Sequence, residues 1–326
     1  MTNLLIRYYR AKVDGAFEPS RFVWSRGLAL LCDRNGGVDF VKRQRGGRKA
    51  LRFDARAYEG IRAGDLVWVR LIALPQFVSE VLPSVTQPFA LVTGDEDWAI
   101  PSGFEGSRRV LESDRVVRWF TQNYDGSDTS GKISGIPIGL DFHTISNTRK
   151  WGHWPATPHE QEAELDALIA EMPPTGAREL LAHADFHFNK HKRQIWGDMR
   201  GDVETLLREN DSVVFQRRKV RRIDLWREKT RYAFVVSPHG NGLDCHRTWE
   251  SLVLGNIPIV KRSSLDPLYD GLPVVIVDDW GEITKENLSR WRDRHADEFA
   301  RPEVQLRLTN RYWIDHMRRA LAAGMP

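Results

Sequence analysis

The sequence lacks the features of secreted and membrane-spanning proteins. Only two of its 326 residues are cysteines, Cys32 and Cys245, which is too few for a disulfide framework and typical of a reducing compartment. The opening residues, MTNLLIRYYRAKVDG, contain no apolar signal core, and no run of about 18 apolar residues occurs anywhere in the chain. We therefore expect a cytoplasmic protein.

The chain also lacks a strong charge of either sign. Its 48 Lys and Arg residues exceed its 44 Asp and Glu residues by only four, and this excess is small for the length. It argues against a general DNA-binding protein and favours anionic small molecules or phosphate groups as ligands. A hydrophobic content of 41% and a charged content of 28% are typical of globular domains, which excludes long disorder and fibrous repeats.

Short apolar runs alternate with helical stretches along the whole chain. Strands are expected at 65–73, 88–94, 115–124 (or a short helix there), 132–142, 179–188, 211–216, 233–238, 257–261 and 273–280. Helices are expected at 74–85, 159–174, 193–210, 222–232, 245–255 and 286–323. Such alternation indicates βαβ units and parallel sheets. The polar segment 146–158 is typical of a linker. We predict an α/β protein with two Rossmann-like β/α/β domains, 1–150 and 151–326, facing a cleft, with the C-terminal helices in the second domain.

The segment 231–260 carries the strongest local signal. A strand is followed by the loop His239-Gly240-Asn241-Gly242 and then by a helix, an arrangement that directs backbone N–H groups toward an anion such as a phosphate. Arg247 and Glu250 lie three residues apart and share one helix face. An Arg there can bind a phosphate at two points, and the Glu can accept both hydroxyls of a ribose. An ordinary surface Arg–Glu pair remains an equal alternative.

The run RTWESLVLGNIPIV resembles the R-x-x-E-x-hydrophobic-x-x-G-x-x-P-V/I signature of exostosin-like glycosyltransferases, with Arg247, Glu250, Gly255 and Pro258 in register. It is also similar to the corresponding segment of α1,3-fucosyltransferases. The resemblance covers about residues 231–280. It implies a GT-B enzyme in which this helix and loop hold the nucleotide of a UDP- or GDP-linked sugar, with Arg247 on the phosphates or base, Glu250 on the ribose and no further cofactor.

Two basic segments are candidate anion sites. Lys190 and Arg193 follow the first strand of the second domain, where cations would neutralise a departing diphosphate. Five cations fall within six residues at Arg217, Arg218, Lys219, Arg221 and Arg222. Their mutual repulsion favours an anionic partner: the nucleotide, bound through Arg218, an anionic glycan, or an acidic membrane surface. Solvated basic loops are the alternative. No recognition motif accompanies them, so nucleic acid is not favoured.

Carboxylates follow two strands of the first half. Asp95-Glu96-Asp97 forms a D-x-D pattern, which holds a divalent metal in GT-A glycosyltransferases. In a GT-B enzyme, Asp95 or Asp97 would instead deprotonate the acceptor hydroxyl, and a capping turn is the third reading. Asp141 and His143 are an alternative base at another strand end. Because the nucleotide signature lies in the second half, we favour the base interpretation and expect no metal.

These patterns together predict a glycosyltransferase. Domain 1–150 would bind a glycan or glycolipid acceptor, and domain 151–326 would bind a nucleotide-sugar donor. By family analogy the enzyme would serve polysaccharide biosynthesis in the cytoplasm, at the inner face of a membrane. Two alternatives stay open: a metal-dependent GT-A transferase using Asp95 and Asp97, and a non-enzymatic module that binds polyanions through Arg217 to Arg222.

Overall fold

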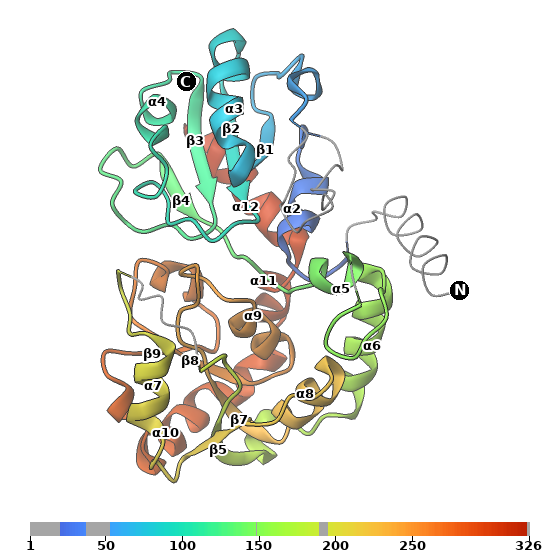
Figure 1. The fold of residues 1–326 in the computed structure, drawn as a ribbon, viewed down its shortest axis with the longest axis vertical. Helices are drawn as coiled ribbons and strands as arrows, with labels where there is room; N and C mark the ends of the chain where they lie inside the picture. The colour runs from blue at the N-terminus through green and yellow to red at the C-terminus, as the bar shows by residue number, and fades with distance from the viewer. Residues whose placement is uncertain (1–19, 37–52, 148, 189–194, 325–326) are drawn as a thin grey trace.

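The computed structural model describes residues 20–36, 53–147, 149–188 and 195–324, and these form an α/β protein with two parallel sheets (Figure 1). The first sheet has the order β1-β2-β3-β4, comprising β1 (Leu66–Arg70), β2 (Phe89–Gly94), β3 (Val116–Thr121) and β4 (Ile133–Gly135). Every residue of β1 and β2 is buried. Because a parallel sheet is covered on both faces, apolar side chains lie on both sides of these two strands, which explains their continuous apolar runs.

The second sheet has the order β6-β5-β7-β8-β9, comprising β5 (Glu179–Ala184), β6 (Val213–Phe215), β7 (Tyr232–Val236), β8 (Ile257–Lys261) and β9 (Val275–Val277). The first strand of this sheet in the sequence, β5, lies inside the sheet, the next strand, β6, lies at its edge, and β7 pairs with β5 on the side opposite β6. The strand order therefore reverses between β5 and β7, and ligands of open α/β sheets bind beyond the carboxyl ends of strands at such a point. The prediction of two Rossmann-like α/β domains is confirmed.

The helices follow the predicted order in the second half, except that the helix expected over 286–323 is divided into three, and the described part of the first half has three helices that were not predicted. They are α2 (Ser25–Leu31), α3 (Leu74–Gln76), α4 (Ser107–Leu111), α5 (His143–Asn147), α6 (Pro158–Glu171), α7 (Arg200–Leu207), α8 (Arg222–Lys229), α9 (His246–Val253), α10 (Lys285–His295), α11 (Pro302–Arg307) and α12 (Asn310–Gly324). The single helix expected over 74–85 is instead α3, a π-helical turn (Phe77–Val81) and a 3-10 turn that starts at Leu82, next to Pro83. Proline lacks an N–H and cannot continue the helical ladder. In the described ranges, no helix has both the length and the apolar character needed to span a bilayer.

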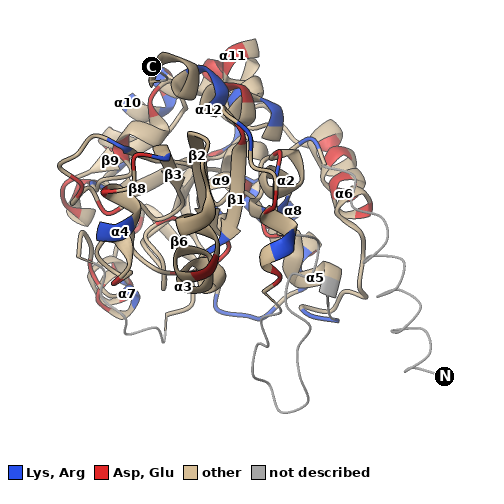
Figure 2. Cartoon of the chain, turned by 90° about the horizontal axis from the view of Figure 1, so that it is seen from above, with Lys and Arg blue, Asp and Glu red and all other residues tan. Residues whose placement is uncertain are grey.

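The C-terminal helix α12 returns to the first sheet, where it contacts β3 and α2 (Figure 1). Asn310 at its start accepts a hydrogen bond from Trp24 N at 3.2 Å, and further along Arg318 pairs with Asp33 at 3.0 Å. Trp313 of α12 packs edge-on against Trp249 of α9 at 6.2 Å, so one apolar core connects the two halves. Acidic and basic residues are interspersed along α10, α11 and α12 (Figure 2).

Candidate active site

The carboxyl ends of the two sheets face one another, and their loops are in direct contact. Asn123 follows β3, and its Oδ1 accepts a hydrogen bond from Asp244 N at 2.8 Å. Asp244 Oδ2 in turn accepts from Ile138 N, in the segment after β4, at 2.8 Å. Ser264 Oγ, beyond β8, donates to Tyr124 O at 2.7 Å. Strand ends from both halves of the chain are therefore brought to one place.

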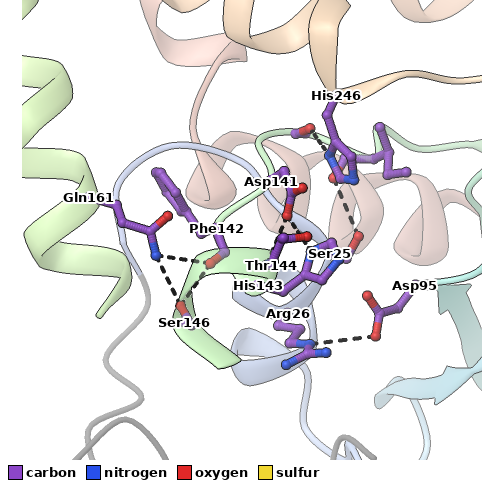
Figure 3. Close-up of polar contacts among 12 residues, drawn as sticks. Ser25, Arg26, Asp95, Asp141, Phe142, His143, Thr144, Ser146, Gln161 and His246 are labelled. Atoms are coloured by element: carbon purple, nitrogen blue, oxygen red, sulfur yellow. Dashed lines mark hydrogen bonds and ion pairs between the residues drawn. The ribbon is translucent and has the colours of Figure 1, made fainter. Parts of the chain in front are cut away.

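Asp141, His143 and His246 form a cluster at this junction (Figure 3). Asp141 lies in the loop after β4, and His143 and His246 are the first residues of α5 and α9. His143 Nδ1 lies 3.1 Å from Asp141 Oδ1, which also accepts from Thr144 N at 3.0 Å. The two imidazole rings are 5.5 Å apart between centroids. The alternative base expected from the sequence is thus an Asp–His pair with a second histidine beside it.

The protonation states of this pair suit proton abstraction. Burial by itself would raise the pKa of Asp141, but His143, His246 and the hydrogen bond from Thr144 hold it below its usual range. Burial lowers the pKa of His143, while the charges of Asp141 and Asp95 oppose this shift. Near neutral pH the carboxylate is therefore ionised and the imidazole neutral, with a lone pair available.

The side chains of the two D-x-D aspartates lie in different environments. The Asp95 side chain is only 4% exposed, and its Oδ2 lies 3.0 Å from Arg70 Nε and 3.5 Å from Arg26 Nε (Figure 3). Arg70 also pairs with Glu96 at 2.7 Å. Asp97 is exposed. A carboxylate held by two guanidinium groups is a poor proton acceptor, so the geometry favours Asp141 and His143 as the base over Asp95 and Asp97.

Arg247 of α9 reaches the carboxyl end of β5 and does not pair with Glu250. Its Nε donates to Asp185 Oδ1 at 2.6 Å, and the buried Lys229 binds Asp185 Oδ2 at 2.7 Å. Glu250 instead accepts from Trp226 Nε1 at 3.3 Å. The surface Arg–Glu pair is therefore not formed, and Arg247 lies at the topological switch point of the second sheet.

Positive charge exceeds negative charge around Asp185. One carboxylate serves both Lys229 and Arg247, and burial together with the charge of Arg247 lowers the pKa of a third cation, Arg200. Arg200 Nε donates to the carbonyl of His239 at 2.8 Å, and its Nη2 lies 3.4 Å from a sulfur, Cys245 Sγ. Nη1 of Arg247 is buried with no hydrogen-bond partner in the described part of the chain. A buried guanidinium nitrogen without a partner, next to further cations, is an arrangement to which an anion could bind.

The glycines of the 239–242 loop serve close packing. A Cβ on Gly240 would lie 2.8 Å from Arg200 Nη2, and one on Gly242 would lie 2.8 Å from Asn123 Oδ1. Gly240 N donates to Gly242 O at 3.0 Å, so this N–H bonds within the loop and does not face an anion as expected. His239 is buried, with Nδ1 2.7 Å from Leu243 O, and Asn241 is partly exposed. The loop brings Arg200 and the end of the first sheet together.

The dense basic segment 217–222 is partly paired with acidic groups of the same chain. Arg217 pairs with Glu204 at 3.2 Å and Arg221 with Asp224 at 2.7 Å. Arg222 is buried, and its guanidinium donates to Gln161 Oε1 at 2.8 Å and to the carbonyl of Asp141 at 3.0 Å. Arg218 is exposed. Arg217 and Arg221 therefore have carboxylate partners, whereas Arg218 and Lys219 are exposed to solvent. Lys190 and Arg193 lie outside the described residues.

Asp244 is a buried carboxylate that joins the two halves. Besides Ile138 N, it accepts hydrogen bonds from Trp249 Nε1 and Cys245 N, each at 2.8 Å from a carboxylate oxygen. Burial raises the pKa of Asp244 to about 6, against the opposing effect of these donors. Its carboxylate therefore takes up a proton more readily in the folded chain than in the unfolded chain.

This shift predicts that Asp244 makes the protein less stable as pH rises. A carboxyl whose folded pKa is raised from 3.8 to about 6 contributes stability below the lower value and loses it as pH rises through the higher one. The loss is about 3 kcal/mol across this window. Urea unfolding at about pH 4 and about pH 7 should show a smaller fall for Asp244→Asn than for the wild type. Asp211→Asn, at an exposed site, should follow the wild type; parallel curves for Asp244→Asn would contradict the shift.

Several residues of the site were not singled out from the sequence: Arg26, Arg70, Asp185, Arg200, Lys229, Asp244 and His246. Asp185 lies within the strand expected over 179–188; in the structure it directly follows β5, as Asp95 follows β2. The others had no signal, since an isolated charged residue or histidine has no local pattern that reveals its partner.

Comparison with solved structures returns glycosyltransferases at low similarity. The chain is similar to an α,α-trehalose-phosphate synthase (UDP-forming) from Burkholderia vietnamiensis, with 15% identity, coverage of 82% of this chain and 74% of that one, and a TM-score of 0.42. A second UDP-forming synthase, from Burkholderia xenovorans in complex with glucose-6-phosphate, matches with 14% identity, coverage of 83% and 80%, and a TM-score of 0.38. An α1,3-fucosyltransferase matches with 11% identity, coverage of 77% and 81%, and a TM-score of 0.33. No protein-family model and no curated protein matches the chain.

Proposed function

We propose that this protein is a glycosyltransferase that moves a sugar from a nucleotide-sugar to a hydroxyl of an acceptor. The observation that carries the proposal is the surplus of buried cations at the switch point of the second sheet, next to an Asp–His pair from the first half. His246, beside the Asp–His pair, and Arg247, among the buried cations, are consecutive residues at the start of α9. The first turn of this helix therefore connects the Asp–His pair with the cations. A transferase needs this combination: anion stabilisation at the leaving group and a base at the acceptor.

The donor diphosphate would bind at the surplus of positive charge. Arg247 supplies an unpartnered Nη1, Arg200 lies beside it, and Lys229 shares the single counter-charge of Asp185. When the bond from the anomeric carbon to the phosphate oxygen breaks, negative charge grows on the diphosphate. Fixed cations in a buried site stabilise that charge without reorganisation.

Glu250 would bind the ribose of a UDP- or GDP-linked donor. It lies three residues after Arg247 on α9, where a carboxylate can accept from both ribose hydroxyls. Support comes from the R-x-x-E-x-hydrophobic-x-x-G-x-x-P signature that residues 247–258 resemble. Gly255 ends this helix with a φ of 67°, a left-handed conformation that glycine adopts without strain.

His143 would take the acceptor proton. Its Nδ1 faces Asp141 at 3.1 Å, which leaves Nε2 as the atom that accepts the proton. As the acceptor oxygen forms its bond to the anomeric carbon, the hydroxyl proton passes to the imidazole, and Asp141 stabilises the imidazolium. The deprotonated state of His143 near neutral pH is the state that this step requires.

A glycan or glycolipid is the acceptor class that we propose. The first half carries an open pocket of about 460 Å³ at the carboxyl side of β2, with Trp98, Phe104 and Arg109 among its lining residues. The rings of Trp98 and Phe104 lie nearly parallel, with centroids 6.4 Å apart. Aromatic faces with a few convergent polar groups are typical of small-molecule sites.

The proposed donor site predicts a specific effect of Arg247→Lys. The ammonium can keep the ion pair with Asp185, but it cannot supply the second, unpartnered nitrogen that we assign to the phosphate. Affinity for UDP- and GDP-sugars should fall by about 1.5–3 kcal/mol, the usual contribution of a charged hydrogen bond, as measured by calorimetry. Arg290→Lys, at an exposed position of α10, is the matched control. Equal donor affinity in Arg247→Lys and Arg290→Lys would contradict the assignment of the donor site to α9. Absence of binding of UDP- and GDP-sugars by the wild type would contradict it as well.

A further inference from the structure

We infer that Asp141, His143 and His246 form a binding site for one divalent transition-metal ion of the Zn²⁺ type. Each side chain offers one ligand atom, and these three atoms lie within 4.8 Å of one another. All three residues are partly buried, and they come from the loop after β4, from α5 and from α9 (Figure 3). A bound ion would therefore connect the segment that follows the first sheet with a helix of the second domain.

The donor set selects the class of metal. Two imidazole nitrogens and one carboxylate oxygen are ligands that Zn²⁺, Co²⁺ and Ni²⁺ bind well. Mg²⁺ and Ca²⁺ prefer sites built from oxygen atoms alone. Three protein ligands also leave a coordination position open for water or another small ligand.

Hydrogen bonds orient the ligands in the way that metal sites require. His246 Nδ1 lies 2.7 Å from Gly139 O, a carbonyl that can only accept, so the proton is on Nδ1 and the lone pair is on Nε2. The Gly139 backbone is held in turn by an antiparallel bridge to Trp24. On the other side, Thr144 N donates to Asp141 Oδ1 and fixes the carboxylate.

The distances match coordination after a small closure. Ligand atoms around a tetrahedral Zn²⁺ at bond lengths of about 2.0–2.1 Å lie about 3.3 Å apart. His143 Nδ1 and Asp141 Oδ1 are already 3.1 Å apart. The longest separation is at most 4.8 Å, so it needs to shorten by no more than about 1.5 Å.

The surrounding charges allow a cation at this point. The nearby Arg26 and Arg70 are compensated by Asp95 and Glu96, with contacts between 2.7 and 3.5 Å. These ion pairs engage Asp95 and Glu96 and leave the carboxylate of Asp141 for the metal. A metal bound through His143 Nδ1 and Asp141 Oδ1 would replace the contact between these two atoms that orients His143 as the acceptor base, so metal-loaded and base-competent forms exclude each other.

The test is a Co²⁺ titration of the full chain after removal of metals with a chelator, without nucleotide or sugar. We expect binding of one equivalent, a visible d–d absorption band typical of four- or five-coordinate Co²⁺, displacement by Zn²⁺ and no displacement by Mg²⁺. In His246→Gln, the amide can still donate to Gly139 O but is a poor metal ligand. Its affinity should fall by more than the roughly 10- to 100-fold that loss of a ligand's hydrogen-bond partner causes.

His159→Ala, which removes an exposed histidine of α6, should bind Co²⁺ as the wild type does. His143→Gln provides a second variant in case His246→Gln does not fold, and circular dichroism confirms folding of each. Absence of stoichiometric Co²⁺ binding by the wild type, or wild-type affinity in both folded variants, would overturn the inference. Because no donor or acceptor is present, either result is independent of whether the protein transfers sugars.

Discussion

His143→Gln is expected to lower the turnover of sugar transfer by about 10²- to 10⁴-fold, the usual contribution of a positioned general base. This corresponds to about 2.7–5.4 kcal/mol of transition-state stabilisation. The physical reason is that His143 is the uncharged member of a pair whose other member, Asp141, is ionised. Nucleotide affinity should not change, because the cations assigned to the diphosphate belong to the second domain.

The experiment combines kinetics in the presence of EDTA with calorimetry of donor binding. His159→Ala is the matched control and should keep wild-type turnover. Wild-type activity should persist below the ordinary histidine pKa of 6.5, since burial lowers the pKa of His143, and should fall as pH drops through that lowered value. If His143→Gln binds the donor normally and its turnover stays within a few-fold of wild type, His143 is not the general base.

Asp185→Asn is expected to destabilise the fold by about 3–5 kcal/mol, the usual effect of removing one partner from a buried ion pair. Lys229 is only 1% exposed, and its Nζ lies 2.7 Å from the carboxylate, so the substitution leaves a buried ammonium without a counter-charge. Arg247 loses its partner as well. Burial opposes ionisation of Asp185, but Lys229 and Arg247 keep its pKa below the usual range, so this stability is present at neutral pH and is lost as pH falls through the lowered pKa.

Denaturant unfolding at neutral pH measures the effect. Asp166→Asn is the control, because Asp166 forms an exposed pair with Arg21, and such pairs contribute no more than about 1 kcal/mol. The double variant Asp185→Asn/Lys229→Met should be more stable than Asp185→Asn, since it removes the uncompensated charge. A loss below about 1 kcal/mol in Asp185→Asn would show that Lys229 and Arg247 do not depend on this carboxylate.

The position of the strands was predictable because burial acts locally. Segments such as 66–70 and 89–94 are continuous apolar runs, and only a strand covered on both faces buries such a run completely. Gly255 likewise marked the end of α9, because a helix ends readily where the chain takes a left-handed conformation. The same local rules placed Asp95 at the end of a strand, whereas the strand expected over 132–142 ends at Gly135 and Asp141 lies in the loop after it.

The roles of the charged residues depended on partners distant in the sequence. Asp95 and Asp141 both follow strands, but Arg26 and Arg70 reach only the first, and His246 approaches only the second. Arg247 had Glu250 as its near neighbour and pairs instead with Asp185, 62 residues away. The sequence alone determined the two parallel sheets, because apolar periodicity is a property of each segment. Only the tertiary structure decided which carboxylate is neutralised and which can accept a proton, because Coulomb and hydrogen-bond energies depend on distance in space.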